Sequence, residues 1–187
     1  MTAYLPQILG PLWGASEFGL MLFKRSKTGA VSKDRHSLGI IWLVTLTAVA
    51  LGVVAAFQLP FCRLPASRLA TAISCGLLIV GVALRWYAIL YLGRFFTVNV
   101  AIHADHQVVD SGPYRFIRHP SYTGSLLTVL GFSMIVNNWA SFVIIVLPCV
   151  AVTLWRIQVE EQALREGLGE RYSIYMRRTR RLIPFVY

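Results

Sequence analysis

Five long apolar runs limit the possible folds of this chain more than any other feature of its sequence. They cover residues 4–23, 38–59, 69–92, 122–136 and 139–155. A helix that crosses the hydrocarbon core of a bilayer needs about 20 mostly apolar residues. The chain has 187 residues, of which 56% are hydrophobic and 14% charged, whereas soluble domains are about 45–50% apolar and about 25% charged. The sequence therefore predicts an all-α integral membrane protein with five transmembrane helices.

The fourth and fifth runs are separated by Asn137 and Asn138 alone. So short a connection predicts that these two helices form an antiparallel hairpin. Both runs are short for full spans, so we expect them to tilt little, to sit where the bilayer thins or to cross only part of it. No basic segment precedes the first run, which argues against a cleavable signal peptide.

The basic residues predict how the chain is oriented in its membrane. Of the 18 Lys and Arg residues, 15 follow the first, third or fifth run, whereas Arg63 and Arg68 lie on the other side and Arg85 lies inside a run. Lys and Arg collect in short cytoplasmic loops. We therefore expect an external N-terminus and a cytoplasmic C-terminus, in an inner or plasma membrane. This distribution also explains the net charge of +10 by membrane topology and contact with anionic headgroups. A nucleic-acid surface is not indicated, because such a surface needs interleaved aromatic and basic residues.

Two polar segments, 93–121 and 156–187, are long enough to build a site outside the bilayer. We accordingly divide the chain into a three-helix membrane region, 1–92, and a catalytic region, 93–187. Cys62, Cys75 and Cys149 are far apart and form no Cys-x-x-Cys pair. Neither a disulfide framework nor a metal site is therefore predicted.

Glu17 and Arg85 are ionisable residues inside apolar runs. Each costs at least ~2.5 kcal/mol on insertion scales, which makes a function the default hypothesis. Each also lies about two turns before the cytoplasmic end of its predicted helix, so the two side chains are placed to pair. A structural role, as an ion pair or as side chains that reach the interface, is favoured over a role in substrate access, and both stay open.

The segment 111–124 concentrates unusual residues near the membrane surface. Gly112 and Pro113 indicate a turn, and Pro120 predicts that the fourth helix begins there. The free N–H groups of that helix start, with Arg118 and His119 beside them, are suited to bind a carboxylate or phosphate. A basic loop that rests on lipid headgroups explains the same residues equally well.

Arg156, Glu160 and Glu161 extend the fifth helix beyond its apolar run. Arg156 and Glu160 are four residues apart and share a helix face, whereas Glu161 is turned about 100° away. Carboxylates at the mouth of a membrane cavity could bind an amino group or ribose hydroxyls. The same residues would equally suit an exposed helix with ordinary ion pairs. Gly169 is expected to end this helix.

In the order and spacing of these motifs, the chain resembles the isoprenylcysteine carboxyl methyltransferase family. The motifs are Ser-Gly-Pro-Tyr at 111–114, Arg-His-Pro-Ser-Tyr at 118–122 followed by Gly124, Glu-Glu at 160–161, and Gly-Glu-Arg-Tyr at 169–172 leading to Leu-Ile-Pro at 182–184. The resemblance implies a cofactor, S-adenosyl-L-methionine, at a cytoplasmic site built from the loop after the third helix and the C-terminal tail. It implies a lipid or lipidated peptide acceptor that enters from the bilayer.

Carried over by position, the resemblance implies a set of cofactor contacts. They are Asn99, His106, Gln107, Val108, Val109, Tyr114, His119, Pro120, Ser121, Tyr122 and Glu160. It also places Arg156 beside the acceptor, as the catalytic and substrate-binding residue. Methyl transfer to a carboxylate needs no general base and gains from alignment and removal of water.

Three other functions stay open on the sequence. A phospholipid amine N-methyltransferase needs a group that takes a proton, for which Glu161, His106 or His103 are candidates. An NADPH-dependent sterol-type reductase resembles Arg-His-Pro-Asn-Tyr-x-Gly-Glu, but Ser121 and Ser125 replace the Asn and Glu of that pattern. A non-catalytic membrane scaffold explains the composition, and it is expected to bind no S-adenosylmethionine.

Overall fold

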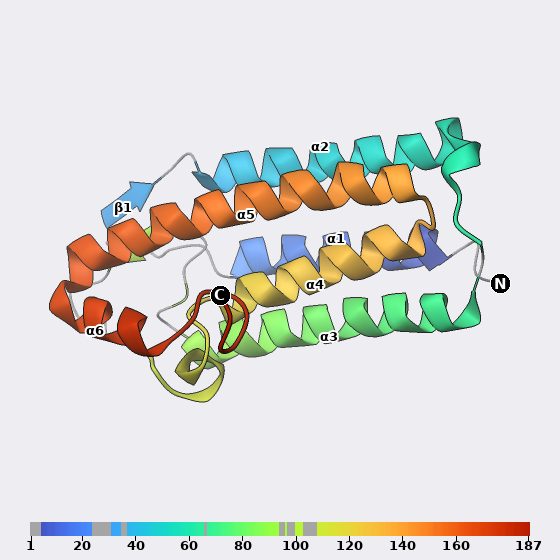
Figure 1. Cartoon of the computed structure of the whole chain (residues 1–187). Coiled ribbons are helices and arrows are strands. Elements are labelled where there is room, and N and C mark those ends of the chain that lie inside the picture. Colours follow the sequence, from blue (N-terminus) through green and yellow to red (C-terminus); the bar gives the residue numbers. More distant parts are fainter. Residues whose placement is uncertain are drawn as a thin grey trace.

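A computed structural model describes residues 5–23, 31–34, 37–65, 67–93, 96, 100–102 and 108–187 of the chain. Its helices are α1 (Leu5–Phe23), α2 (Ser37–Gln58), α3 (Arg68–Leu92), α4 (Pro120–Ile135), α5 (Trp139–Leu168) and α6 (Glu170–Arg178). Short 3-10 turns, η2 (Pro60–Cys62) and η4 (Gly112–Arg115), and two strands, β1 (Val31–Asp34) and β2 (Val100–Ile102), complete the described elements. The first five helices form an elongated bundle with α6 at one end (Figure 1).

The first four predicted apolar runs coincide with α1 to α4 to within two residues, whereas α5 continues 13 residues beyond the fifth run to Leu168, where Gly169 follows as the sequence predicted. Asn138 caps α5, its side chain accepting the Ser141 N–H at 3.1 Å. Asn137 adopts the left-handed φ of 58° in the turn between α4 and α5, a conformation that Asn tolerates better than most residues. The predicted helical hairpin is therefore confirmed.

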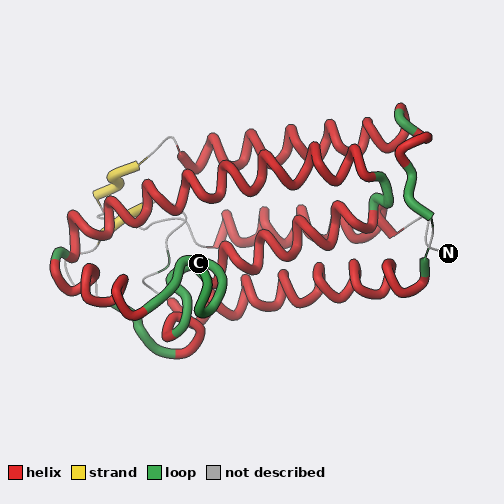
Figure 2. The backbone as a smooth tube through the Cα atoms, viewed as in Figure 1, coloured by secondary structure: helices red, strands yellow, loops and turns green. Residues whose placement is uncertain are grey.

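Two differences from the predicted fold concern strands and spans. β1 and β2 pair antiparallel into a small sheet, visible beside the ends of the helices in Figure 2, whereas the sequence predicted helices alone. Within the described part of the chain, α2, α3 and α5 are long and apolar enough to cross a membrane. α4 has 16 residues, or about 24 Å at 1.5 Å per residue, which is less than the hydrocarbon core of about 30 Å.

Helices pair in the order α2 on α5, α5 on α4, and α4 on α3, with α1 against α4 (Figure 1). The core between them contains Ala48, Leu78, Phe132, Ile145 and Cys149. Large apolar side chains on the outer faces of α2 and α3 are exposed, as is usual where a helix faces lipid tails.

Close packing of α4 on α3 depends on glycines. A side-chain carbon at Gly124 would lie 2.6 Å from the backbone nitrogen of Arg85 and 2.6 Å from the carbonyl oxygen of Gly81. Helices that approach so closely need small residues at the contact. This packing brings the start of α4 to the end of α3. We call this end of the bundle, where Arg118 also lies, the basic end.

Candidate functional site

A cavity of about 260 Å³ lies within the bundle and reaches its basic end. Much of its polar lining comes from η4 and the segments that begin α4 and end the apolar part of α5: Tyr114, His119, Ser121, Tyr122, Arg156 and Glu160. Its apolar lining comes from α1, α2 and α4, and includes Trp13, Leu20, Trp42, Val49, Leu126 and Val129. The cavity is therefore suited to a ligand with one polar and one apolar part.

Three polar side chains form a row along the cavity wall. The Arg156 Nε donates a hydrogen bond to the Tyr122 hydroxyl at 3.3 Å, and this hydroxyl donates to Glu160 Oε2 at 2.9 Å. Arg156 and Glu160 are one turn apart on α5, so their side chains share a face. Arg156 is 2% exposed, so a carboxylate held by its guanidinium would be largely removed from bulk water.

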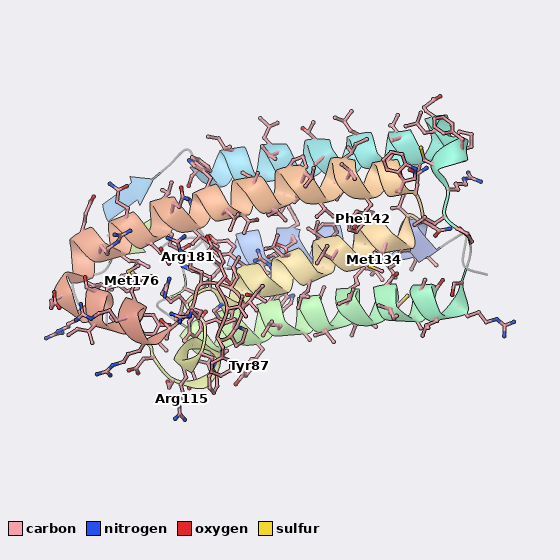
Figure 3. All side chains as sticks on the ribbon, in the orientation of Figure 1. Tyr87, Arg115, Met134, Phe142, Met176 and Arg181 are labelled. Atoms are coloured by element: carbon pink, nitrogen blue, oxygen red, sulfur yellow. The ribbon has the colours of Figure 1, made fainter. Side chains whose placement is uncertain are left out.

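The neighbouring carboxylate, Glu161, points to the other side of α5 and is fully buried. Its Oε1 accepts from Arg118 Nε at 2.8 Å and lies 3.3 Å from His119 Nε2. Its Oε2 accepts from Arg181 Nε at 3.1 Å and Nη2 at 2.9 Å. A buried carboxylate needs such charged partners. Glu161 therefore joins α5 to the start of α4 and to the segment after α6, where Figure 3 labels Arg181.

The segment after α6 also holds the start of α4 through its backbone. The N–H groups of Arg118 and His119 donate to the carbonyl oxygens of Arg180 at 2.7 Å and Arg181 at 3.1 Å. The Thr123 hydroxyl donates to the Leu182 carbonyl at 2.8 Å. The position of His119 in the cavity wall thus depends on residues some 60 positions later in the chain.

Tyr114 is fixed from both sides at the polar end of the cavity. Its hydroxyl donates to the Ala88 carbonyl at 3.2 Å, and its own carbonyl accepts from the Tyr175 hydroxyl at 2.7 Å. Burial is the main cause that raises the pKa of Tyr114 and of Tyr175 above their ordinary values. Both phenols therefore stay neutral donors at physiological pH.

Glu17 and Arg85 form the predicted pair, and both line the cavity. The Arg85 Nε lies 2.6 Å from Glu17 Oε1, and its Nη2 donates to Oε2 at 2.7 Å. A further Arg85 donor reaches the Ser125 hydroxyl at 2.6 Å. Arg85 on α3 therefore connects α1 to α4 at the cavity wall.

The structure brings most of the predicted site residues together. Tyr114, His119, Ser121, Tyr122, Arg156 and Glu160 line one cavity, and Pro120 is buried at the start of α4. Val108 and Val109 are described and partly buried, but they are not among the residues that line this cavity. Asn99, His103, His106 and Gln107 lie outside the described residues.

Two expectations about single residues change. Arg118 and His119 were candidates to bind an external carboxylate or phosphate, with a basic loop on lipid headgroups as the equal alternative, and the carboxylate of Glu161 contacts both side chains. Glu161 was also a candidate proton acceptor. It is fully buried behind His119 and held by two arginines, so it is not placed to contact an acceptor in the cavity.

Sequence reasoning missed several side chains that shape the site. Trp13 and Trp42 line its apolar part, but within apolar runs they look like ordinary membrane residues. Arg181 was counted only as a basic residue. Its contact with Glu161 bridges 20 positions, and only the packing of the tail against α5 reveals it.

Comparison with known proteins identifies the same region of the chain. The model of the isoprenylcysteine carboxyl methyltransferase family matches residues 73–166, which is half of the chain and includes α4 and the polar residues of α5. A probable protein-S-isoprenylcysteine O-methyltransferase of Oryza sativa subsp. indica is 32% identical over 112 residues, or 59% of each chain. The protein-S-isoprenylcysteine O-methyltransferase of Saccharomyces cerevisiae is 32% identical over 123 residues, which are 65% of this chain and 52% of the yeast protein. The chain thus spans between half and three fifths of the length of these relatives.

A solved structure supports the fold over the whole chain. The eukaryotic intramembrane Ras methyltransferase ICMT superimposes with a TM-score of 0.72 at 23% sequence identity, covering 100% of this chain and 72% of that one. At this identity the likeness establishes a common fold.

Proposed function

The chain belongs to the isoprenylcysteine carboxyl methyltransferase family, and from this premise we propose that it transfers a methyl group from S-adenosyl-L-methionine to the carboxylate of an isoprenylcysteine-type acceptor. The protein is an integral membrane protein with a helical bundle of the family's fold. Its acceptor, in this proposal, is a lipid or a lipidated peptide that reaches the cavity from the bilayer.

The observation that carries the proposal is the position of Arg156. Its guanidinium lies in the wall of a cavity that is polar at the basic end and apolar along α1 and α2. Arginine binds carboxylates well because its planar fork of donors matches their two oxygens. A prenyl chain in the apolar part would leave the acceptor carboxylate near Arg156.

The polar residues around Arg156 fit the chemistry of the cofactor. Glu160 offers carboxylate oxygens for ribose hydroxyls or an ammonium group, while Tyr114, His119 and Tyr122 add aromatic surface and hydrogen-bonding groups. The resemblance adds Asn99, the segment 106–109, Pro120 and Ser121 to this set. When bound, S-adenosyl-L-methionine supplies a methyl group activated by its sulfonium charge.

The chain's own residues would then align the acceptor and exclude water. Arg156 holds the carboxylate in one orientation, and the Tyr122 hydroxyl keeps the guanidinium and Glu160 in fixed positions. A carboxylate is already ionised at neutral pH, so no residue has to remove a proton. Rate enhancement then comes from positioning in a site that is shielded from solvent.

The same proposal includes the topology. We place the basic end in the cytosol, because most Lys and Arg residues lie on that side of the apolar runs. The cofactor site is then cytosolic and the N-terminus is outside. α1 and α4 are then membrane-embedded helices beside α2, α3 and α5. Residues 93–187 form the catalytic region and residues 1–92 the membrane region that adds the apolar cavity wall.

A binding experiment tests the cofactor part. We expect detergent-purified protein to bind S-adenosylhomocysteine in calorimetric titration, and Glu160→Gln to weaken this binding about tenfold, which is about 1.4 kcal/mol. Glu166→Gln, on the exposed part of the same helix, is the matched control and should leave the affinity unchanged. Absence of binding by folded protein, also in lipid nanodiscs, would contradict the proposal.

The product of methyl transfer tests the acceptor part. Protein in nanodiscs is supplied with radiolabelled S-adenosylmethionine and either a farnesylcysteine analogue or phosphatidylethanolamine. A methyl ester releases labelled methanol in mild base, whereas an N-methyl amine keeps its label. We expect base-labile label on the farnesylcysteine analogue, and base-stable label on the phospholipid would support N-methylation instead.

A further inference from the structure

The last turn of the described chain exposes apolar side chains outside the helical bundle. Phe185 is 84% exposed and Val186 is 73% exposed, and Ile183 and Phe116 are exposed beside them. The rings of Phe116 and Phe185 contact each other edge to face, with 6.5 Å between their centroids. We call these four residues the turn patch. Exposed apolar clusters of this kind usually mark a surface that binds something.

The turn patch sits on a well-fixed support. The Leu182 and Ile183 N–H groups both donate to the Tyr187 carbonyl at 2.7 Å, which closes the turn. Leu182 is buried, and its carbonyl accepts from Thr123 in the first turn of α4. The exposure of Phe185 and Val186 is therefore a property of an ordered turn anchored to the bundle.

The turn lies at the basic end of the bundle, which the proposed topology places at a membrane surface. The C-terminal turn lies beside the end of α3 and the start of α4, on the bundle side of α6 (Figure 1). Near that end of α3, Tyr87 and Tyr91 are exposed, and exposed tyrosines at helix ends are typical of the membrane interface. Figure 3 labels Tyr87 and Arg115 in this region, with Arg115 pointing away from the molecule.

Basic side chains flank the patch. Arg115 and Arg180 are exposed, and the Arg115 guanidinium lies 5.8 Å from the centre of the Phe116 ring. Arg115 and Arg180 lie on two segments that are joined by the β-bridge between Ile117 and Arg180. Apolar side chains between arginines are the pattern by which surface segments insert into a leaflet that contains anionic lipids.

We propose that the turn patch is a membrane contact separate from the transmembrane helices. Phe185 and Val186 enter the headgroup region of the adjacent leaflet, and Arg115 and Arg180 bind anionic phospholipid headgroups. The backbone of the same segment holds Arg118 and His119. Contact with the leaflet would therefore keep the start of α4 close to the membrane surface.

Depth-dependent fluorescence quenching tests the contact. Phe185→Trp is reconstituted in bilayers of phosphatidylcholine and phosphatidylglycerol whose acyl chains are brominated near the headgroups. The signal of the parent protein, which has five tryptophans, is subtracted. Ile174→Trp, at an exposed apolar position of α6, is the matched control. We expect most of the emission added by Phe185→Trp to be quenched, and the emission added by Ile174→Trp to be unaffected.

The charge requirement is tested in the same assay. Quenching of Phe185→Trp should be weaker in pure phosphatidylcholine, and adding Arg115→Gln and Arg180→Gln should abolish this difference between the two lipids. Emission insensitive to brominated lipid in both bilayers would overturn the proposal, and it would leave a protein partner as the occupant of the patch. Equal quenching at both positions would also overturn it, since the whole region would then rest on the membrane. Circular dichroism checks that each variant is folded, and no reading depends on methyl transfer.

Discussion

Among single residues, Arg156 has the surroundings that best match one ligand group, a carboxylate attached to an apolar chain. It lies in the wall of a cavity that is also lined by Glu160 and by apolar side chains of α1 and α2, and it contacts the Tyr122 hydroxyl. A buried guanidinium in this position can hold an acceptor carboxylate with two parallel hydrogen bonds. A lysine at the same place would keep the charge but offer a single point of contact.

We expect Arg156→Lys to lower kcat/KM for the prenylcysteine acceptor about 10- to 100-fold. The reason is that hydrogen bonds to charged groups contribute about 1.5–3 kcal/mol. Affinity for S-adenosylhomocysteine should change less than about twofold, since less than about 0.4 kcal/mol is then involved. Initial rates at varied acceptor concentration and calorimetry measure the two quantities. Arg171→Lys, at an exposed position of α6, is the control, and normal acceptor kinetics in Arg156→Lys would remove the assigned role.

At this scale the sequence allowed part of the site to be predicted. Helix periodicity places Arg156 and Glu160 on one face and turns Glu161 away, and the structure has both features. That the Tyr122 hydroxyl lies between Arg156 and Glu160 depends on how α4 packs against α5. Such packing between helices leaves no periodic signal in either segment, so the row of three could not be derived from the sequence.

At the scale of elements, the contact between α3 and α4 determines where the polar end of the cavity lies. Gly124 allows the two backbones to touch, and the start of α4 carries His119 and Tyr122 into the cavity wall. Any side chain at Gly124 would separate the two helices.

We expect Gly124→Ala to lower the free energy of unfolding by about 1–3 kcal/mol, the usual cost of overpacking. Gly76→Ala is the matched control, because Gly76 lies in α3 with open space around it. There, alanine should stabilise the helix by up to about 1 kcal/mol. Thermal denaturation in one detergent compares the two variants, and equal behaviour would contradict the close contact.

The tyrosines of η4 and α6 predict the response to alkaline pH. Burial is the largest cause that raises the pKa of Tyr114, Tyr172 and Tyr175 above the ordinary value of 10.0. Below that pH the phenols are neutral in both folded and unfolded protein, so they add no pH dependence. Above it the unfolded chain loses protons that the folded protein keeps, so stability should fall by up to about 1.4 kcal/mol per pH unit for each tyrosine. Melting curves between neutral pH and pH above 10 measure this fall, and Tyr175→Phe should make it less steep.

The element boundaries were largely predictable, whereas the small sheet was not. Apolar runs, Asn137, Asn138, Pro120 and Gly169 indicate where helices start and stop, because these residue types have strong backbone preferences. β1 and β2 have four and three residues. Strands this short in polar connections show too little alternation to be recognised.

At the scale of the whole molecule, Glu161 connects three parts of the chain that are distant in sequence. Its carboxylate binds the start of α4 through Arg118 and His119 and the tail through Arg181. Removing one partner of a buried charge cluster leaves the remaining charges without compensation.

We expect Glu161→Gln to destabilise the protein by about 3–5 kcal/mol and to weaken S-adenosylhomocysteine binding through the displaced His119. Glu170→Gln is the control, because the ion pair of Glu170 with Arg177 is mostly exposed: the side chain of Glu170 is 73% exposed and that of Arg177 is 66% exposed. Exposed pairs contribute about 0–1 kcal/mol. Urea denaturation compares the two variants. Similar free energies of unfolding would show that the contacts of Glu161 contribute little to stability.

Glu160 and Glu161 point in directions about 100° apart, which restricts the changes in chain length that α5 can tolerate. Deleting one residue before Glu160 rotates everything after it by about 100°, which would bring Glu161 to the place of Glu160 and put the amide of Gln162 beside Arg118, His119 and Arg181. Inserting about seven residues, close to two full turns, would restore the direction but shift both carboxylates about 10 Å along the axis. Between Asn138 and Glu160 the gene should therefore accept substitutions far more readily than insertions or deletions of any length.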